Sequence, residues 1–241
     1  HQAPSTSLSD PELSALRAEA RLWAESDPDQ HTKALTLALV DSDEPADIAR
    51  LQERFRGRLS FGTAGLRGPV DLGPNAMSAA PVRRVSLALG LHIKAQVNVP
   101  SDAPDEPLRV VIGYDARHGS QAFADEATRA LAGLGFEVHL SPTLCPTPLL
   151  AHAVKHLGAV AGVMVTASHN PPQDNGFKVY WGDGAQIIPP HDHEISARID
   201  EVGDGSSYPR PTFAELHERQ LLVTLTAAQG DAYERAQLAA R

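Results

Sequence analysis

The sequence predicts an α/β fold, a mostly parallel sheet with helices on both faces, preceded by a helical N-terminal segment. Three observations lead to this prediction. Short apolar runs alternate with amphipathic segments over residues 108–165, in the order strand, helix, strand, helix, strand. The last run, GAVAGVMV (158–165), carries no charge, which is typical of a strand buried on both faces. Residues 1–58, in contrast, show the spacing of amphipathic helices.

The N-terminal segment is predicted to hold three helices and to end near Gly57. The first follows SDPE (9–12), a capping-box pattern with proline in the first turn, and runs to Ser26. DPDQHTKALTLALV (27–40) and PADIARLQERF (45–55) are the other two. LSFGTAGLRGPV (59–70) departs from helical spacing, and glycine and proline account for that change.

A further helix over residues 81–97 and a proline-rich linker, NVPSDAPDEPL (98–108), precede the predicted sheet. The alternating strands and helices are then LRVVIGYD (108–115), QAFADEATRALAGLG (121–135), FEVHLS (136–141), PTPLLAHAVKHLG (146–158) and AVAGVMV (159–165). GFKVYW (176–181) and AQIIPP (185–190) are expected to form a hairpin or edge strands. We predict a main domain at 59–205, and a linker with the start of an incomplete second domain at 206–241.

Composition excludes several classes of protein. In 241 residues, 42% are apolar, which is enough for a sizeable core, and the net charge of −9 argues against nonspecific binding to nucleic acid or to an anionic membrane. No run approaches the roughly 20 apolar residues of a membrane span, and no secretory signal is visible, so a cytoplasmic protein is expected. Cys145 is the single cysteine, and we expect it to be a buried thiol.

The strand ending at Val165 is followed by TASHNPPQDNG (166–176), which places a serine where ligands bind in open α/β sheets. Ser168 is a weak nucleophile that needs a base or a positive group beside it, and His169 and Lys178 are nearby in the sequence. A polar turn, with the serine bonded to its own backbone, would explain the same residues.

FGTAGLRG (61–68) is a second candidate site. Its three glycines surround Arg67, so that successive backbone N–H groups could bind an anion beside a guanidinium. No Gly-Lys-Ser/Thr follows, so it is not a nucleotide-binding P-loop. Taken by itself, the segment would also fit a flexible glycine turn.

Four motifs together resemble the amino-terminal part of the α-D-phosphohexomutases, the phosphoglucomutase and phosphomannomutase enzymes. In order, they are FGTAGLRG, GYDAR (113–117), PTP (146–148) and TASHNPPQDNGFKVYW (166–181). The resemblance spans about residues 59–200, and QDNGFKVYWGDGAQIIPPHD is similar to the phosphoglucomutase/phosphopentomutase branch. It implies a phosphoserine domain of the type that opens these enzymes.

The resemblance implies that Ser168 carries phosphate between the 1- and 6-positions of a hexose, through a bisphosphate intermediate. Glucose phosphates are the first expectation, with mannose or pentose phosphates as alternatives and glucose 1,6-bisphosphate as activator. By the same resemblance, His169 and Lys178 are candidates for positioning or proton transfer, and Arg67 for charge stabilisation. The implied phosphate-binding residues are Thr63, Gly65 and Asn170, the last of which would orient the loop.

Magnesium is implied as well, held in the family by the phosphoserine and by three aspartates of a DGDxDR loop in a second domain. That loop does not occur here, and WGDGA (181–185) and VGDGS (202–206) are interpreted as turns. Ser168, through its phosphate, is the one metal ligand expected in this chain. We therefore expect a fragment that is inactive alone.

Other interpretations were compared with this one. A noncatalytic sugar-phosphate-binding or interaction module is the main alternative, whereas a serine hydrolase would need a Gly-x-Ser-x-Gly elbow. HDHE (191–194) fits a solvated turn leading into a helix better than a zinc site. Asp115 and Arg117 are expected to pair or to brace a loop. Small sugar phosphates are the predicted partners, and nothing in the sequence specifies an oligomeric state.

Overall fold

The computed structural model describes residues 8–97, 106–226, 233 and 235, so most of the predicted 98–108 linker lies outside the described residues. Six strands form one sheet in the order β1-β5-β4-β2-β3-β6. The strands are β1 (Leu66–Pro69), β2 (Arg109–Tyr114), β3 (Glu137–Leu140), β4 (Ala161–Val165), β5 (Asp174–Trp181) and β6 (Leu222–Thr224). The helices are α1 (Asp10–Ser26), α2 (Gln30–Asp41), α3 (Pro45–Phe55), α4 (Ala79–Gln96), α5 (Ser120–Gly133), α6 (Thr147–His156), α7 (His191–Val202) and α8 (Phe213–Glu218).

The centre of the sheet is parallel, as the alternating apolar and amphipathic segments predict. β2 pairs in parallel with β3 and with β4, and β6 pairs in parallel with β3. β5 runs antiparallel to both β4 and β1. The carboxyl ends of β2 and β4 therefore meet at one edge, where loops between strands and helices gather.

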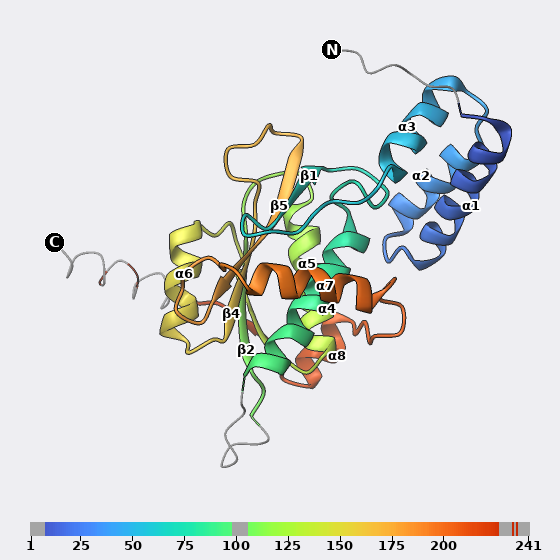
Figure 1. The fold of residues 1–241 in the computed structure, drawn as a ribbon. Coiled ribbons are helices and arrows are strands. Elements are labelled where there is room, and N and C mark those ends of the chain that lie inside the picture. The colour runs from blue at the N-terminus through green and yellow to red at the C-terminus, as the bar shows by residue number, and fades with distance from the viewer. Residues whose placement is uncertain (1–7, 98–105, 227–232, 234, 236–241) are drawn as a thin grey trace.

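Helices cover both faces of this sheet (Figure 1). Val110 and Ile112 of β2 belong to a core cluster shared with α4, α5 and α7, whereas Val111 between them packs with Leu150 and Val154 of α6. This alternation follows from the strand pleat, which sends successive side chains to opposite faces. β4, the strand predicted to carry no charge, is accordingly buried on both sides, as is β2 beyond its first residue.

β5 corrects one part of the prediction. The segment GFKVYW is not an edge strand, because β5 lies inside the sheet between β1 and β4. The chain turns back after Trp181, but AQIIPP contributes only an isolated antiparallel bridge between Tyr180 and Gln186. β1 was not predicted, since four residues containing glycine and proline give no strand pattern.

The three N-terminal helices form where the sequence predicts them. The capping box at Ser9 and Glu12 is present. In Figure 1 these helices stand beside the sheet domain, and they contact it through a separate apolar cluster that includes Phe55 and Leu72. Arg54 of α3 pairs with Asp71 at 2.7 Å, and this ion pair ties the helical segment to the loop after β1.

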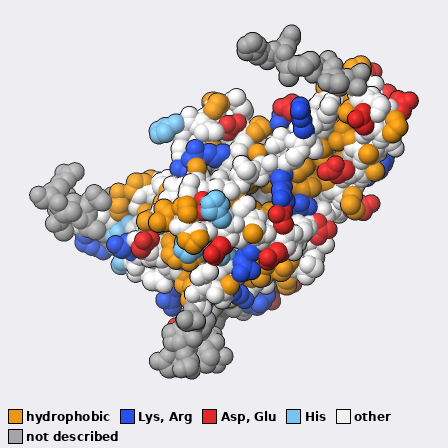
Figure 2. All heavy atoms as spheres, in the orientation of Figure 1, with side chains coloured by type: hydrophobic (Ala, Val, Ile, Leu, Met, Phe, Trp, Pro, Cys, Tyr) orange, Lys and Arg blue, Asp and Glu red, His pale blue; other side chains and the backbone are white. Residues whose placement is uncertain are grey.

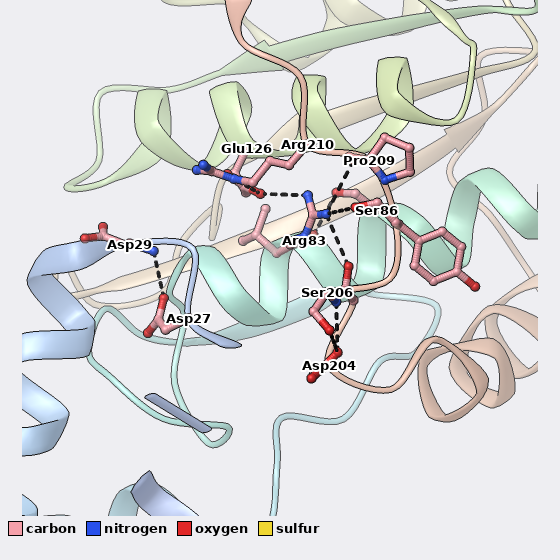
Figure 3. A network of polar contacts seen from close by, with 12 residues as sticks. Asp27, Asp29, Arg83, Ser86, Glu126, Asp204, Ser206, Pro209 and Arg210 are labelled. Carbon is pink, nitrogen blue, oxygen red and sulfur yellow. Dashed lines mark hydrogen bonds and ion pairs between the residues drawn. The ribbon is translucent and has the colours of Figure 1, made fainter. Parts of the chain in front are cut away.

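Residues 203–212 run across α4 and α5 and are held there by a network of polar contacts (Figure 3). Arg83 of α4 donates to the carbonyl oxygens of Gly205, Tyr208 and Pro209, and it pairs with Glu126 of α5. Beyond this linker, α8 follows and β6 joins the sheet. The domain boundary at residue 205 stays a prediction. β6, which lies after that boundary in the chain, is part of the same six-stranded sheet.

Acidic and basic side chains are interspersed on the face shown in Figure 2. Among the described helices, none is both long enough and apolar enough to cross a membrane. Cys145 is buried as expected, and this burial raises the pKa of its thiol. The HDHE motif forms the first turn of α7 itself and not a solvated turn before it, and Asp192 within the motif is buried.

Candidate active site

Ser168 lies in the connection between β4 and β5, three residues after β4 ends at Val165. Its backbone has a φ of 56°, in the left-handed region that residues other than glycine seldom adopt. The Ser168 N–H donates to Thr166 Oγ1 at 3.0 Å, which helps to hold this conformation. The side chain is half-buried at the carboxyl edge of the sheet. The buried strand thus delivers a serine in a strained conformation, and such strain is concentrated at functional sites.

Lys178 approaches Ser168 from the neighbouring strand. In the β4–β5 ladder it stands opposite Met164, and its Nζ donates a short hydrogen bond to Ser168 Oγ. Burial lowers the pKa of Lys178 below its ordinary value of 10.5, and the positive charge of Arg67 lowers it further. A lysine with a lowered pKa next to a hydroxyl is suited both to hold an anion and to exchange a proton.

Arg67 reaches the same place from β1. It stands opposite Gly176 in the β1–β5 ladder, and a Cβ on that glycine would lie 2.7 Å from the Thr166 oxygen and 2.8 Å from the Leu66 oxygen. The absence of a side chain at residue 176 therefore lets the strands approach closely. Arg67 Nε is buried and has no hydrogen-bond partner among the described residues. An unpaired cationic donor beside Lys178 makes this edge suitable for an anion.

The glycine segment before β1 has a clear structural role at Gly65. Gly65 has a φ of 82°, and a Cβ there would lie 2.1 Å from the carbonyl oxygen of Phe177, the residue before Lys178. Thr63 is exposed, and its carbonyl accepts a hydrogen bond from the Gln186 side chain. Phosphate binding by Thr63 and Gly65 stays a prediction.

The two residues after Ser168 behave differently from each other. Asn170 Nδ2 donates to Asp174 Oδ2 at 3.0 Å, and the Asn170 N–H donates to Ala167, so this residue organises the loop. His169 is exposed, and its ring has no hydrogen-bond or ion-pair partner among the described residues. The structure brings Lys178 to the serine oxygen and leaves His169 outside that contact.

Some supporting residues gave no signal in the sequence. Thr166 and the fully buried Asn175 are the main ones; Asn175 Nδ2 donates to the His118 oxygen and to Ser120 Oγ, both at 2.9 Å. Asp115 and Arg117, predicted to pair or to brace a loop, do pair at 3.4 Å. An isolated Asn or Thr has no recognisable spacing, so only the fold identifies such partners.

The described residues do not form the implied magnesium site by themselves. They contain no group of three His, Cys, Asp or Glu side chains placed to hold a metal ion. Magnesium prefers several hard oxygen ligands in octahedral geometry, which these side chains do not supply. Ser168 through a phosphate stays the one proposed ligand.

Comparisons with known proteins identify the family of the chain. Residues 58–205 match the family described as phosphoglucomutase/phosphomannomutase, alpha/beta/alpha domain I. The chain therefore belongs to the phosphoglucomutase/phosphomannomutase family, as the motif resemblance predicts. A crystal structure from Thermus thermophilus, of a protein provisionally named a phosphomannomutase, is 32% identical with a TM-score of 0.55, covering 71% of this chain and 34% of that one.

The chain is also similar to three curated proteins. It is 41% identical to a phosphoribomutase of Saccharomyces cerevisiae, over 78% of this chain and 29% of that protein. It is 37% identical to a phosphopentomutase of Mus musculus, over 79% of this chain and 32% of that protein. It is 40% identical to a phosphoglucomutase of Staphylococcus aureus, over 67% of this chain and 28% of that protein. The chain thus spans about three tenths of the length of these relatives.

Proposed function

We propose that this chain is the phosphoserine-bearing domain of a phosphosugar mutase, and that Ser168 is the residue that carries the phosphate. The contact between Lys178 Nζ and Ser168 Oγ, at the carboxyl edge of the sheet, is the observation on which the proposal rests. Arg67 adds a second positive charge, and a phosphoserine dianion needs such charges. Membership of the mutase family supports the same assignment.

In the proposed reaction, a hydroxyl oxygen of a sugar monophosphate attacks the phosphorus on Ser168. The bond from phosphorus to Ser168 Oγ breaks, and the hydroxyl gives its proton to solvent water, which returns a proton to the sugar oxygen released in the second half-reaction. We propose that Lys178 supplies a proton to the departing Oγ and takes it back when Ser168 attacks the other phosphate of the bisphosphate intermediate. Charge spreads over the oxygens of the moving group, so positioning and electrostatics dominate the catalysis of such steps. His169 is the second candidate for proton transfer.

The proposed substrates are hexose 1- and 6-phosphates, glucose before mannose, together with pentose phosphates. The names of the relatives, phosphoglucomutase, phosphoribomutase and phosphopentomutase, support both sugar sizes. Glucose 1,6-bisphosphate is the proposed activator. When bound, magnesium would neutralise phosphate charge, and the described side chains include no cluster that would hold it without the phosphate.

A noncatalytic sugar-phosphate-binding module is the alternative. Turnover by the full-length protein would exclude it. We expect residues 1–241 alone to give no measurable interconversion of glucose 1-phosphate and glucose 6-phosphate, because the chain spans only 28% to 29% of the length of such relatives. Robust magnesium-dependent turnover by this segment would show that the rest of the relatives' length is not needed.

The test is mass spectrometry of the full-length protein after treatment with glucose 1,6-bisphosphate. Phosphate is expected on Ser168, and Ser168→Ala should remove both the phosphate and the turnover. The melting temperature should change little, because Ser168 lies on a loop and its loss leaves no core cavity. Ser206→Ala, on an exposed turn, is the matched control and should keep both. Phosphate on another residue, or an active Ser168→Ala variant, would refute the assignment.

A further inference from the structure

Arg117 contacts the Ser168 loop, residues 166–176, through several hydrogen bonds from a single side chain. Its guanidinium donates four hydrogen bonds to main-chain carbonyl oxygens. Nη2 binds the oxygens of Ser168 and Asn170, both at 2.9 Å. Nη1 binds the oxygens of Pro171 at 2.8 Å and Asp174 at 2.9 Å. One side chain from the end of β2 thus contacts the loop at both ends of its turn.

The guanidinium is itself held from behind. Its side chain is only 15% exposed, and Nε lies 3.4 Å from Asp115 Oδ2. Asp115 Oδ1 in turn accepts from Ser120 Oγ at 2.7 Å and from the Arg117 N–H at 3.0 Å. Because Asp115 directly follows β2 and Ser120 begins α5, the orientation of Arg117 is fixed by the core of the fold.

The loop needs such a partner for two physical reasons. Pro171 and Pro172 carry no N–H, so the loop has few donors of its own with which to pair its carbonyls. In addition, Ser168 stands in the left-handed region, which persists only where the surroundings enforce it. Converging carbonyl oxygens also place negative partial charge near the site of a phosphate, and a cation between them offsets it. Arginine meets these needs with five donors in a rigid plane, whereas lysine is a point charge.

We propose that Arg117 is the positioning residue for the phosphate-carrying serine, an inference that rests on the proposed function. By holding the carbonyl of Ser168 it directs Oγ towards Lys178, and by holding the carbonyls of Asn170, Pro171 and Asp174 it keeps the loop closed. Arg117 contacts no reacting atom, so it acts through Ser168. It should therefore affect the rate of phosphoryl transfer more than the binding of sugar phosphate.

The experiment compares Arg117→Lys and Arg117→Met with the wild-type full-length protein. The readouts are kcat, KM, phosphate on Ser168, the melting temperature, and hydrogen exchange of residues 166–176. A displacement of about 1 Å at the reacting atoms can cost on the order of 10²-fold in rate, so we expect Arg117→Lys to lower kcat by about that factor with KM unchanged. Arg117→Met should lose more, since it also loses the charge.

Two arginine variants serve as controls. Arg109→Lys changes an arginine at the opposite end of β2, paired with Glu137 and 45% exposed, and should resemble the wild type in every readout. Arg83→Lys weakens a second arginine that binds carbonyls, far along the chain from Ser168. It should lower the melting temperature and leave kcat per folded molecule unchanged, which is the behaviour of a purely structural residue.

Each outcome decides the inference. Faster exchange confined to residues 166–176, with a lower kcat in both Arg117 variants, supports it. It is overturned if both variants keep wild-type kcat while the wild type is phosphorylated on Ser168, or if their loss of activity only follows a loss of folded protein as in Arg83→Lys. A wild-type protein without phosphate on Ser168 would instead remove the proposed function and the positioning role with it.

Discussion

Two arginines each collect carbonyl oxygens from an irregular segment, and they do so in different surroundings. Arg117 binds four carbonyls of the Ser168 loop at 2.8 to 2.9 Å. Arg83 binds three carbonyls of the linker after α7 at 2.9 to 3.4 Å (Figure 3). The side chain of Arg83 is 5% exposed and that of Arg117 is 15% exposed.

The acidic partners of the two arginines differ more in solvent exposure than the arginines themselves do. Glu126, the partner of Arg83, is 3% exposed and is also held by Arg210 through hydrogen bonds of 2.7 and 3.0 Å. Asp115, the partner of Arg117, is 27% exposed at the open edge of the sheet. Burial lowers the pKa of Arg83, and Glu126 opposes that shift. The Glu126 carboxylate is thus buried between two arginines, whereas the Asp115 carboxylate near Ser168 is partly exposed to solvent.

We infer from this difference that arginine–carbonyl contacts stabilise the fold in the linker bound by Arg83, and that they orient the Ser168 loop where Arg117 makes them. A buried charged group that loses its partner carries a large desolvation cost. At a partly exposed edge, water can replace some of the lost contacts, so the effect on folding is smaller and the effect on orientation becomes visible.

Removing the charge of Glu126 should have the largest effect on folding. Glu126→Gln leaves two arginines without their shared carboxylate, and breaking a buried ion pair in this way costs about 3 kcal/mol. Urea unfolding measures the change. Glu201→Gln, which breaks the surface pair between Arg198 and the exposed Glu201, is the matched control and should cost less than about 1 kcal/mol. Equal losses in the two variants would contradict the contrast between buried and exposed charges.

Gly65→Ala should disturb the site from the side of β1. An alanine Cβ would lie 2.1 Å from the Phe177 oxygen at a φ of 82°, so β5 must move next to Lys178. We expect a loss of about 2 kcal/mol from steric overlap and backbone strain. Gly57→Ala is the control, because its φ is 84° but nothing lies within 4 Å of the added Cβ, and it should cost about 1 kcal/mol.

The comparison of these two glycine variants separates backbone strain from close packing. Thermal unfolding gives the stability, and the Lys178 resonance in NMR spectra reports on the site. If Gly65→Ala and Gly57→Ala lose the same stability, the contact between the glycine segment and β5 does not matter to the fold.

The titration of Lys178 should have the smallest effect on stability, and the change should be confined to the surroundings of this residue. Burial and Arg67 hold it below 10.5, so the folded protein releases this proton at a lower pH than the unfolded chain. This group therefore adds to stability as pH rises through the folded pKa towards 10.5, and that contribution is lost as pH falls below the folded pKa. NMR titration of the Lys178 ammonium, assigned with Lys178→Arg, measures the value.

Phosphate on Ser168 should reverse the direction of this shift. A dianion beside Lys178 favours the charged ammonium, so the pKa of Lys178 should rise on phosphorylation. An unchanged pKa in protein shown by mass spectrometry to carry phosphate on Ser168 would mean that Lys178 does not face that phosphate.

Local patterns in the sequence determined the elements and the main motifs. Helical spacing and capping signals predicted α1 to α6, and the apolar runs predicted β2, β3 and β4, because these patterns depend on neighbours along the chain. The motif around Ser168 identified the family through the same kind of local information. His169 and Lys178 were equal candidates at that level.

Tertiary structure decided what depends on residues distant in the sequence. It placed β5 inside the sheet, which brings Lys178 rather than His169 to Ser168 Oγ. It also brought Arg117 to the carbonyls of a loop that begins 51 residues later. Such contacts are set by strand order and register, and the hydrophobic pattern of a single segment does not encode which strand lies beside it.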